Sequence, residues 1–183
     1  MTVATKLTAA EYLELEKSAE VRHEFVDGVM LAMAGSSLQH NEIVFRLRAS
    51  LTGFAQTKKC VIATESLRVM TRVRRYRYPD LVVSCAPQND DHCIDQPCLI
   101  VEVLSESTAQ IDHNDKLEEY TRLPSLQRYA IISQDVRRVI VYKRSLDGWA
   151  VEILEDGSID IPCLETSVTL EQIYAGLEWS RSE

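Results

Sequence analysis

The sequence predicts an α/β fold in which a central mixed β-sheet is flanked by helices, with additional β-hairpins. The first observation is the segment PCLIVEVLS at 97–105, a nearly continuous apolar run that is typical of a strand covered on both faces. The second is the alternation of helical and strand patterns along the chain. The third is a pair of Asp-Gly turns, at 27–28 and 147–148, each of which lies between apolar-rich runs as in a β-hairpin.

Four helices are expected, and three of them begin or end at a local signal. A capping box at 8–11 precedes the first helix, Ser36 or Ser37 can cap the second, and a proline stops the third. The helices are expected from about 9 to 17, from the serine pair to about 56, from about 112 to 122, and in the short segment TLEQIYAGL near the end of the chain.

The strands are predicted from runs of β-branched and apolar residues. They are the hairpin HEFVDGVMLAM, the segments CVIATESLRVM, YPDLVVSC, PCLIVEVLS and RYAIIS, and a hairpin of VRRVIVYKR and WAVEILE that EDGSIDIP closes. The arginine-rich stretch between CVIATESLRVM and YPDLVVSC is expected to be a connecting turn. No repeat, low-complexity tract or linker interrupts the pattern, so the 183 residues are expected to form a single domain, 1–183.

The charge of the chain is unevenly distributed. The net charge of −8 excludes a protein that coats nucleic acid with its whole surface. The segment 58–77, however, carries +6, which leaves −14 for the rest. Four arginines near its end are candidates for binding phosphate, namely Arg72, Arg74, Arg75 and Arg77. The alternative is an exposed hairpin whose arginines pair with the acidic remainder of the chain.

The N-terminal segment and the hydropathy indicate a cytoplasmic protein. The first 20 residues include six charged side chains, and no stretch approaches the roughly 18–20 apolar residues of a spanning helix. We therefore expect a protein that does not associate with membranes.

The cysteines are expected to be reduced thiols, most of them in the core. Their number is odd and none forms a CxxC pair, which argues against a disulfide framework and against a standard zinc knuckle. The five are Cys60, Cys85, Cys93, Cys98 and Cys163.

Two acidic residues lie in or beside apolar strands. Glu102 interrupts the run 97–105, and a carboxylate buried there needs a metal, a cation or a proton as partner. Asp80 follows a proline at the start of a second apolar strand. If the strands are neighbours, the two carboxylates form a site suited to Mg²⁺ or Mn²⁺. Alternatively, Glu102 reaches water or an arginine at a strand end and Asp80 only ends a turn.

The third helix presents a polar face. Asp112, Lys116 and Tyr120 are spaced four residues apart and therefore lie on one side of the helix. A lysine aimed at two metal-binding carboxylates can orient or help deprotonate a water, or offset charge on a phosphate. The alternative is an ordinary solvated face. Glu24 in its strand and His40 in its helix are, by position alone, more typical of core-edge residues.

Several segments resemble, in order, the Uma family of restriction endonuclease domains, formerly a domain of unknown function. They are RHEFVDGVMLAMAGSSLQH, YPDLVV, LIVEVLSEST, the spacing from Asp112 through Lys116 to Tyr120, and LQRYAIIS. The resemblance covers nearly the whole chain. This family belongs to the PD-(D/E)XK nuclease-like superfamily, so the resemblance implies a restriction-endonuclease-like core and Mg²⁺-dependent hydrolysis of phosphodiester bonds.

The resemblance also implies roles for individual residues. Asp80 and Glu102 match the two acids of the superfamily motif, and Lys116 matches the lysine that this family places on the following helix. The position two after Glu102 holds Leu104 instead of the lysine of the plain superfamily pattern. The implied metal, Mg²⁺ or Mn²⁺, is held by Asp80, Glu102 and the carbonyl of Val103, while Lys116 positions the attacking water. Possible accessory residues are Glu24, His40, Asp112 and Tyr120.

Three functions compete. The first is a metal-dependent DNA endonuclease, expected as a homodimer because cutting both strands needs two sites. Its DNA binding is expected to be weak without metal and steeply salt-dependent. The second is a catalytically degenerate module that binds nucleic acid or a protein partner. The third is a sugar hydrolase with two carboxylates, which the basic segment disfavours and whose activity would survive chelation.

Overall fold

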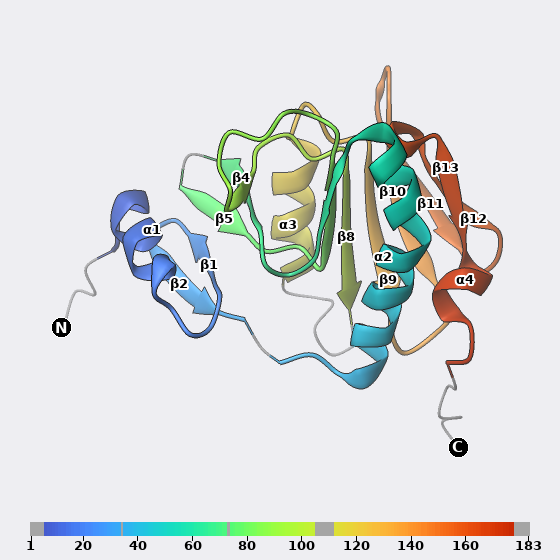
Figure 1. Cartoon of the computed structure of the whole chain (residues 1–183), viewed down its shortest axis with the longest axis horizontal. Helices are drawn as coiled ribbons and strands as arrows, with labels where there is room; N and C mark the ends of the chain where they lie inside the picture. The colour runs from blue at the N-terminus through green and yellow to red at the C-terminus, as the bar shows by residue number, and fades with distance from the viewer. Residues whose placement is uncertain (1–5, 34, 73, 105–111, 178–183) are drawn as a thin grey trace.

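Helices cover a central mixed β-sheet on both of its faces in the computed structural model (Figure 1). The structure describes residues 6–33, 35–72, 74–104 and 112–177, without the side chains of 112 and 113. Among these residues, no helix combines the length and apolar character needed to cross a lipid bilayer.

The central sheet has six strands in the order β11-β10-β9-β8-β6-β3. One of its two middle strands, β8, is parallel to β9 and antiparallel to β6, so the predicted mixed sheet is confirmed. The strands are β3 (Val61–Ala63), β6 (Leu81–Ser84), β8 (Leu99–Leu104), β9 (Arg128–Ser133), β10 (Val139–Ser145) and β11 (Gly148–Leu154).

The two faces of β8 pack against different helices. Leu99, Val101 and Val103 join the core cluster that contains the apolar face of α2 (Leu38–Lys58). Ile100 belongs to the second cluster, beneath α3 (Asp112–Thr121). Because side chains alternate along a strand, Glu102 shares the face of Ile100. The residue that interrupts the apolar run therefore points toward α3.

A second, five-stranded sheet carries the N-terminal part of the chain. Its order is β2-β1-β5-β4-β7, and α1 (Ala9–Lys17) packs on it through Tyr12, whose ring stacks on Phe25 at 4.6 Å between centroids. The predicted turn between β1 and β2 is confirmed by positive φ angles at Asp27 and Gly28. The strands are β1 (His23–Val26), β2 (Val29–Ala32), β4 (Arg68–Arg72), β5 (Arg75–Arg77) and β7 (Cys93–Ile94).

The C-terminal segment packs beside α2. It contains β12 (Ser158–Ile161), a 3-10 helix (Pro162–Leu164), β13 (Thr166–Thr169) and α4 (Leu170–Tyr174). β12 pairs with β13 in a two-stranded sheet. The expectation that EDGSIDIP closes the β10–β11 hairpin is therefore wrong, because β12 finds its partner further along the chain.

Two predictions for the segment 60–77 are also wrong. CVIATESLRVM is not one strand: a turn at Glu65, with φ 49°, separates β3 in the central sheet from β4 in the other sheet. The arginine-rich stretch is not a simple turn either, because β4 and β5 form an antiparallel hairpin. The polar residues in the middle of CVIATESLRVM mark the boundary between the two sheets. A period-two pattern alone cannot distinguish two short strands in different sheets from one long strand.

The expectation that the cysteines are reduced is contradicted for four of the five. Disulfides join Cys60 to Cys85 and Cys98 to Cys163, while Cys93 is free and buried. The register of β3 on β6 pairs Val61 with Ser84, so Cys60 and Cys85 come opposite each other just beyond the ladder. This proximity depends on sheet pairing, which the spacing of cysteines in the sequence does not encode.

Candidate active site

The pairing of β6 with β8 brings the two predicted acids together. Leu81 is opposite Val101 and Val82 is opposite Ile100 in this antiparallel pair. Continuing the register by one residue places Asp80 opposite Glu102. Their side chains are buried, with 8% and 3% of the residue surface exposed. Two carboxylates from neighbouring strands thus line the same region of the molecule.

Asp80 is held by the backbone of β8 and by α2. Its Oδ2 accepts a hydrogen bond from the Val103 amide at 2.6 Å, and its Oδ1 lies 3.3 Å from Nε2 of His40. The same nitrogen lies 3.3 Å from Glu65 Oε1. His40 lies in the first turn of α2, where the side chain of Ser37 accepts its backbone N–H. The cap of α2 thereby positions a histidine between two carboxylates.

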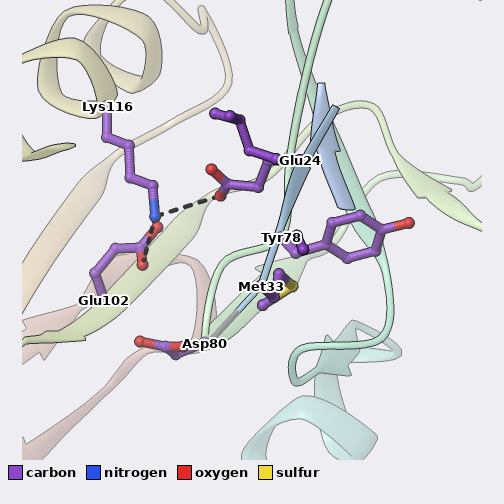
Figure 2. Close-up of a pocket in the computed structure, with 8 residues that line it drawn as sticks. Glu24, Met33, Tyr78, Asp80, Glu102 and Lys116 are labelled. Carbon is purple, nitrogen blue, oxygen red and sulfur yellow. Dashed lines mark hydrogen bonds and ion pairs between the residues drawn. The ribbon is translucent and has the colours of Figure 1, made fainter. Parts of the chain in front are cut away.

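Glu102 is held by two residues of α3. Its Oε1 accepts a hydrogen bond from the Tyr120 hydroxyl at 2.8 Å, and its Oε2 lies 3.3 Å from Nζ of Lys116. The ammonium also lies 3.4 Å from Oε1 of Glu24 on β1. Figure 2 marks both contacts of the ammonium with dashed lines. The predicted common face of Lys116 and Tyr120 is confirmed. The helix directs a cation and a phenol toward the sheet.

The pKa values of the site residues are shifted by burial and by the closeness of several carboxylates. The pKa of Glu102 is raised to about 8; burial is the largest cause, Asp80 and Glu24 also raise the pKa, and the charge of Lys116 lowers it. Burial and the neighbouring Glu102 raise the pKa of Tyr120, which keeps its hydroxyl a donor. Burial is the largest single influence on the pKa of His40 and lowers it, but the hydrogen bonds and charges of Asp80 and Glu65 together outweigh burial, so the net shift is upward.

These groups surround a cavity of about 290 Å³. Glu24, Asp80, Glu102 and Lys116 supply its charged lining, and Figure 2 shows them converging from different elements. A wider cavity of about 610 Å³ adjoins it, since Asp80 and Met33 line both. His40, Glu65 and Val103 belong to the wider cavity. The two together offer space for a substrate beside the carboxylates.

The donor set suits a hard divalent cation. The cavity combines three carboxylates with one lysine, so oxygen atoms dominate as possible ligands, as Mg²⁺ and Mn²⁺ prefer. Glu102 is a buried acid whose ionised form a cation would stabilise. The Val103 carbonyl stays a predicted ligand, and the side chain of Asp112 lies outside the described residues.

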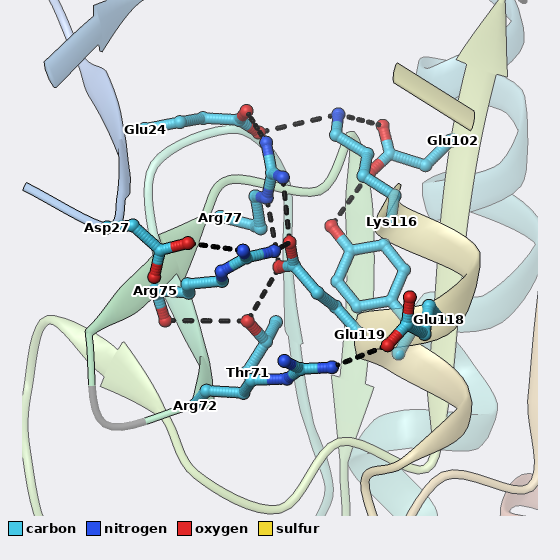
Figure 3. Close-up of polar contacts among 11 residues, drawn as sticks. Glu24, Asp27, Thr71, Arg72, Arg75, Arg77, Glu102, Lys116, Glu118 and Glu119 are labelled. Carbon is cyan, nitrogen blue, oxygen red and sulfur yellow. Dashed lines mark hydrogen bonds and ion pairs between the residues drawn. The ribbon is translucent and has the colours of Figure 1, made fainter. Parts of the chain in front are cut away.

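The arginines of the basic segment are largely neutralised by acids. Arg77 is 2% exposed and lies 2.7 Å from Glu24 Oε2 and 2.8 Å from Glu119 Oε1. Arg75 binds Asp27 and Glu119, and Arg72 binds Glu118, as Figure 3 shows. Three of the predicted phosphate ligands therefore pair with carboxylates, as the stated alternative expects, but the hairpin is not exposed as that alternative also expects, because Arg77 is buried and Arg72 and Arg75 are only partly exposed. Arg74 is exposed between β4 and β5.

Arg77 and Glu119 contribute to the site through Glu24, a connection that sequence reasoning missed. Arg77 binds one oxygen of Glu24 and Lys116 lies beside the other. Glu119 follows Lys116 by three residues, so both lie on the buried side of α3. The three-residue spacing could have predicted that Glu119 lies on the same side of the helix as Lys116. No local pattern in the sequence predicts that Glu119 pairs with Arg77 on another element.

Comparisons with known proteins agree with this architecture. Residues 9–171 match the family model Uma2, described as a putative restriction endonuclease. The chain is 31% identical over 177 residues to the uncharacterized protein slr1290 of Synechocystis sp., covering 94% of this chain and 93% of that protein. It is 36% identical over 151 residues to sll1609 of the same organism, covering 79% and 85%.

The fold is shared with solved structures, and one of them matches nearly the whole chain. It is the crystal structure of a putative nuclease belonging to DUF820 from Anabaena variabilis, with a TM-score of 0.73. The alignment covers 92% of this chain and 98% of that one, at 17% sequence identity. The predicted fold class is confirmed.

Proposed function

Because the chain belongs to the Uma2 family of putative restriction endonucleases, we propose that it is a metal-dependent endonuclease that hydrolyses phosphodiester bonds of DNA. Family and fold together support a nuclease role. The observation that carries the finer proposal is the convergence of Asp80, Glu102 and Lys116, from β6, β8 and α3, on one cavity. Two acids and a lysine in this arrangement suit phosphoryl transfer.

The proposed metal ligands are Asp80, Glu102 and the carbonyl of Val103. When bound, Mg²⁺ or Mn²⁺ supplies Lewis-acid stabilisation of the negative charge that develops on the phosphoryl oxygens. The chain contributes the orientation of the acids: the Val103 amide fixes Asp80, and the Tyr120 hydroxyl fixes Glu102. These contacts reduce the reorganisation that ligand binding requires.

Lys116 is the proposed partner of the attacking water. Its Nζ lies 3.3 Å from Glu102 and 3.4 Å from Glu24. An ammonium donates hydrogen bonds and accepts none, so Lys116 holds the water through its oxygen and offsets charge on the phosphate. Glu24 would orient the lysine because Arg77 holds its other oxygen.

The competing functions require a different arrangement or a different response to metal. A catalytically degenerate module has no need for a buried lysine beside two acids, whereas here Lys116 is 8% exposed and directed into the cavity. A sugar hydrolase with two carboxylates would keep its activity in a chelator. The nuclease proposal requires activity to disappear with the metal.

The test is cleavage of supercoiled plasmid DNA with Mg²⁺, Mn²⁺ or EDTA. Glu102→Gln and Lys116→Met are expected to lower the rate at least about 100-fold, the lower end of the contribution of positioned proton-transfer groups. The matched controls Glu14→Gln and Lys17→Met change an exposed pair on α1 and should keep full activity. Circular dichroism must show that each variant is folded.

Two results would refute this proposal. The first is that folded wild-type chain, with either metal, leaves supercoiled, linear and single-stranded DNA uncut. The second is that Glu102→Gln cuts as fast as the wild type. Binding of intact DNA by the wild type together with the first result would favour the degenerate module instead.

The proposal includes a homodimer, because two copies of the site are needed to cut both strands of a duplex. Light scattering coupled to size exclusion is expected to give twice the 20.8 kDa mass of the chain. A mass of one chain, with and without duplex DNA, would remove the dimer from the proposal and leave single-strand nicking as the expected activity.

A further inference from the structure

Four cysteines from separate segments form one cluster. Cys60 follows α2, Cys85 follows β6, Cys98 precedes β8, and Cys163 lies in the 3-10 helix. The disulfides are Cys60–Cys85 and Cys98–Cys163, yet Sγ of Cys85 lies only 4.0 Å from Sγ of Cys98. The sulfurs of Cys85, Cys98 and Cys163 all lie within 4.8 Å of one another. The two disulfides thus share one site.

This site is separate from the carboxylate cavity. Cys85 and Asp80 lie at opposite ends of β6, five residues apart, which corresponds to about 17 Å along a strand. Neither cavity at the carboxylates is lined by any of the four cysteines. The proposed nuclease chemistry uses none of them.

The spacing of the sulfurs suits a tetrahedral thiolate site. Four sulfurs bound to Zn²⁺ at about 2.3 Å lie about 3.8 Å from one another. The distance of 4.0 Å between the two disulfides is already close to this value. A disulfide holds its sulfurs about 2 Å apart. After reduction, the sulfurs of each former pair therefore have to move about 1.8 Å further apart to reach the separation in a zinc site. Rotation of side chains at the strand ends can supply such a displacement.

The cluster is accessible from one side. Cys98 is 6% exposed and Cys85 is exposed, so the cluster has a protected side and an open side through which a metal ion can enter.

We propose that the reduced four-cysteine cluster binds one Zn²⁺ as a tetrathiolate. Each disulfide first takes two electrons and two protons from a dithiol reductant, which itself becomes a disulfide. The four resulting thiols then bind Zn²⁺ and release four protons. The disulfides and the zinc site are alternative cross-links of the same segments: the disulfides tie β3 to β6 and β8 to the C-terminal segment in two separate pairs, whereas one zinc ion ties all four segments together.

The test titrates Co²⁺, a spectroscopic substitute for Zn²⁺, into the full chain after reduction and removal of metal. One equivalent is expected to produce the thiolate-to-cobalt charge-transfer band and the visible bands of a tetrahedral tetrathiolate, and one equivalent of Zn²⁺ should abolish them. The chain oxidised to disulfides should give no bands. Metal bound by carboxylates gives no charge-transfer band, so the readout is independent of the proposed nuclease site.

Variants identify the ligands. Cys98→Ser and Cys163→Ser should each weaken Zn²⁺ affinity by more than about 100-fold, since loss of a supporting residue alone costs 10–100-fold. The matched control is Cys93→Ser, which removes the free cysteine on β7 and should leave affinity unchanged. Absence of charge-transfer bands in the reduced wild type would overturn the proposal. So would a loss of affinity in Cys93→Ser equal to that in Cys98→Ser.

Discussion

Glu102 is a carboxylate buried in the middle of the central sheet, and its ionisation couples the site to the stability of the fold. Burial raises its pKa to about 8, above the ordinary value of 4.5. Between these two pH values the folded chain binds more protons at this residue than the unfolded chain does. The contribution of Glu102 to stability is therefore present below about pH 4.5 and is lost as the pH rises through about 8.

Glu102→Gln is expected to remove this pH dependence. Between pH 5.5 and 8.5, the wild type should lose unfolding free energy relative to the variant, by at most about 1.4 kcal/mol per pH unit. Urea unfolding in EDTA at several pH values measures the difference. Glu14→Gln, on the exposed face of α1, is the control and should follow the wild type. Equal slopes for wild type and Glu102→Gln would contradict the prediction.

Arg77 illustrates how a buried charge supports the site. Its guanidinium joins Glu119, which is fully buried, to Glu24. Arg77→Met should lower the unfolding free energy by about 3–5 kcal/mol, because it leaves acids buried without their cation. Arg122→Met removes an exposed pair with Glu118 and should cost less than about 1 kcal/mol. Similar losses in the two variants, measured by urea unfolding, would exclude a special role for Arg77.

At the scale of elements, α2 and α3 each contribute side chains to the site, and they contact different carboxylates. α3 points Lys116 and Tyr120 at Glu102 from one face of the sheet, whereas α2 brings His40 to Asp80 from its first turn. The beginning of α2 is therefore part of the site. Its N-cap is Ser37, which resolves the choice between Ser36 and Ser37 that the sequence left open.

Ser37→Ala is expected to lower the unfolding free energy by about 1 kcal/mol, the usual cost of losing an N-cap. Its hydroxyl accepts the His40 amide at 3.0 Å and donates to Gln134 at 2.5 Å. Ser36→Ala is the matched control and should change stability by a few tenths of a kcal/mol. Thermal unfolding of the three proteins makes the comparison, and an equal loss in both variants would argue against Ser37 as the cap.

The elements with strong local signals could be predicted, and those defined by pairing could not. The capping box before α1, the Asp-Gly turn of β1–β2 and the apolar run of β8 were each sufficient to identify an element. The division of 60–70 between two sheets was missed because both pieces have strand character. Which strands become neighbours depends on the packing of the whole chain.

In the site, too, residues with a local sequence signal could be predicted, whereas contacts between distant segments could not. Glu102 was identifiable because a charge interrupts an apolar strand, and Lys116 with Tyr120 because their spacing places them on one helix face. Arg77 was predicted to bind phosphate because its charge alone was visible in the sequence. Its partner Glu119 lies 42 residues away, and no local pattern connects them.

At the scale of the whole molecule, the ion pairs of β4 and β5 change the salt dependence that is expected of the proposed DNA binding. The basic segment predicted a steep dependence, but Arg72, Arg75 and Arg77 are paired with acids. We now expect only about 2–4 phosphate contacts, and hence a slope of about −2 to −4 for log K against log salt.

Fluorescence anisotropy of labelled duplex DNA measures this slope with the Glu102→Gln chain, which is expected not to cleave the DNA. Arg74→Ala, introduced in that background, should reduce its magnitude by about 1, because Arg74 is the exposed arginine of the four candidates. Lys17→Ala, on α1, should leave it unchanged. A slope steeper than about −6 would show that the paired arginines exchange their carboxylates for phosphate.

The topology of the central sheet also has a consequence for biosynthesis. β8 lies between β6, which is made before it, and β9, which is made after it. When Glu102 is added to the growing chain, neither α3 nor β9 exists. At about 5–20 residues per second, synthesis reaches Ser133 about 2–6 s later. During this interval the nascent chain carries Asp80 and Glu102 before α3 and the neighbouring strand of Glu102 have both been made, so the carboxylate cavity cannot be assembled until these later elements have been translated.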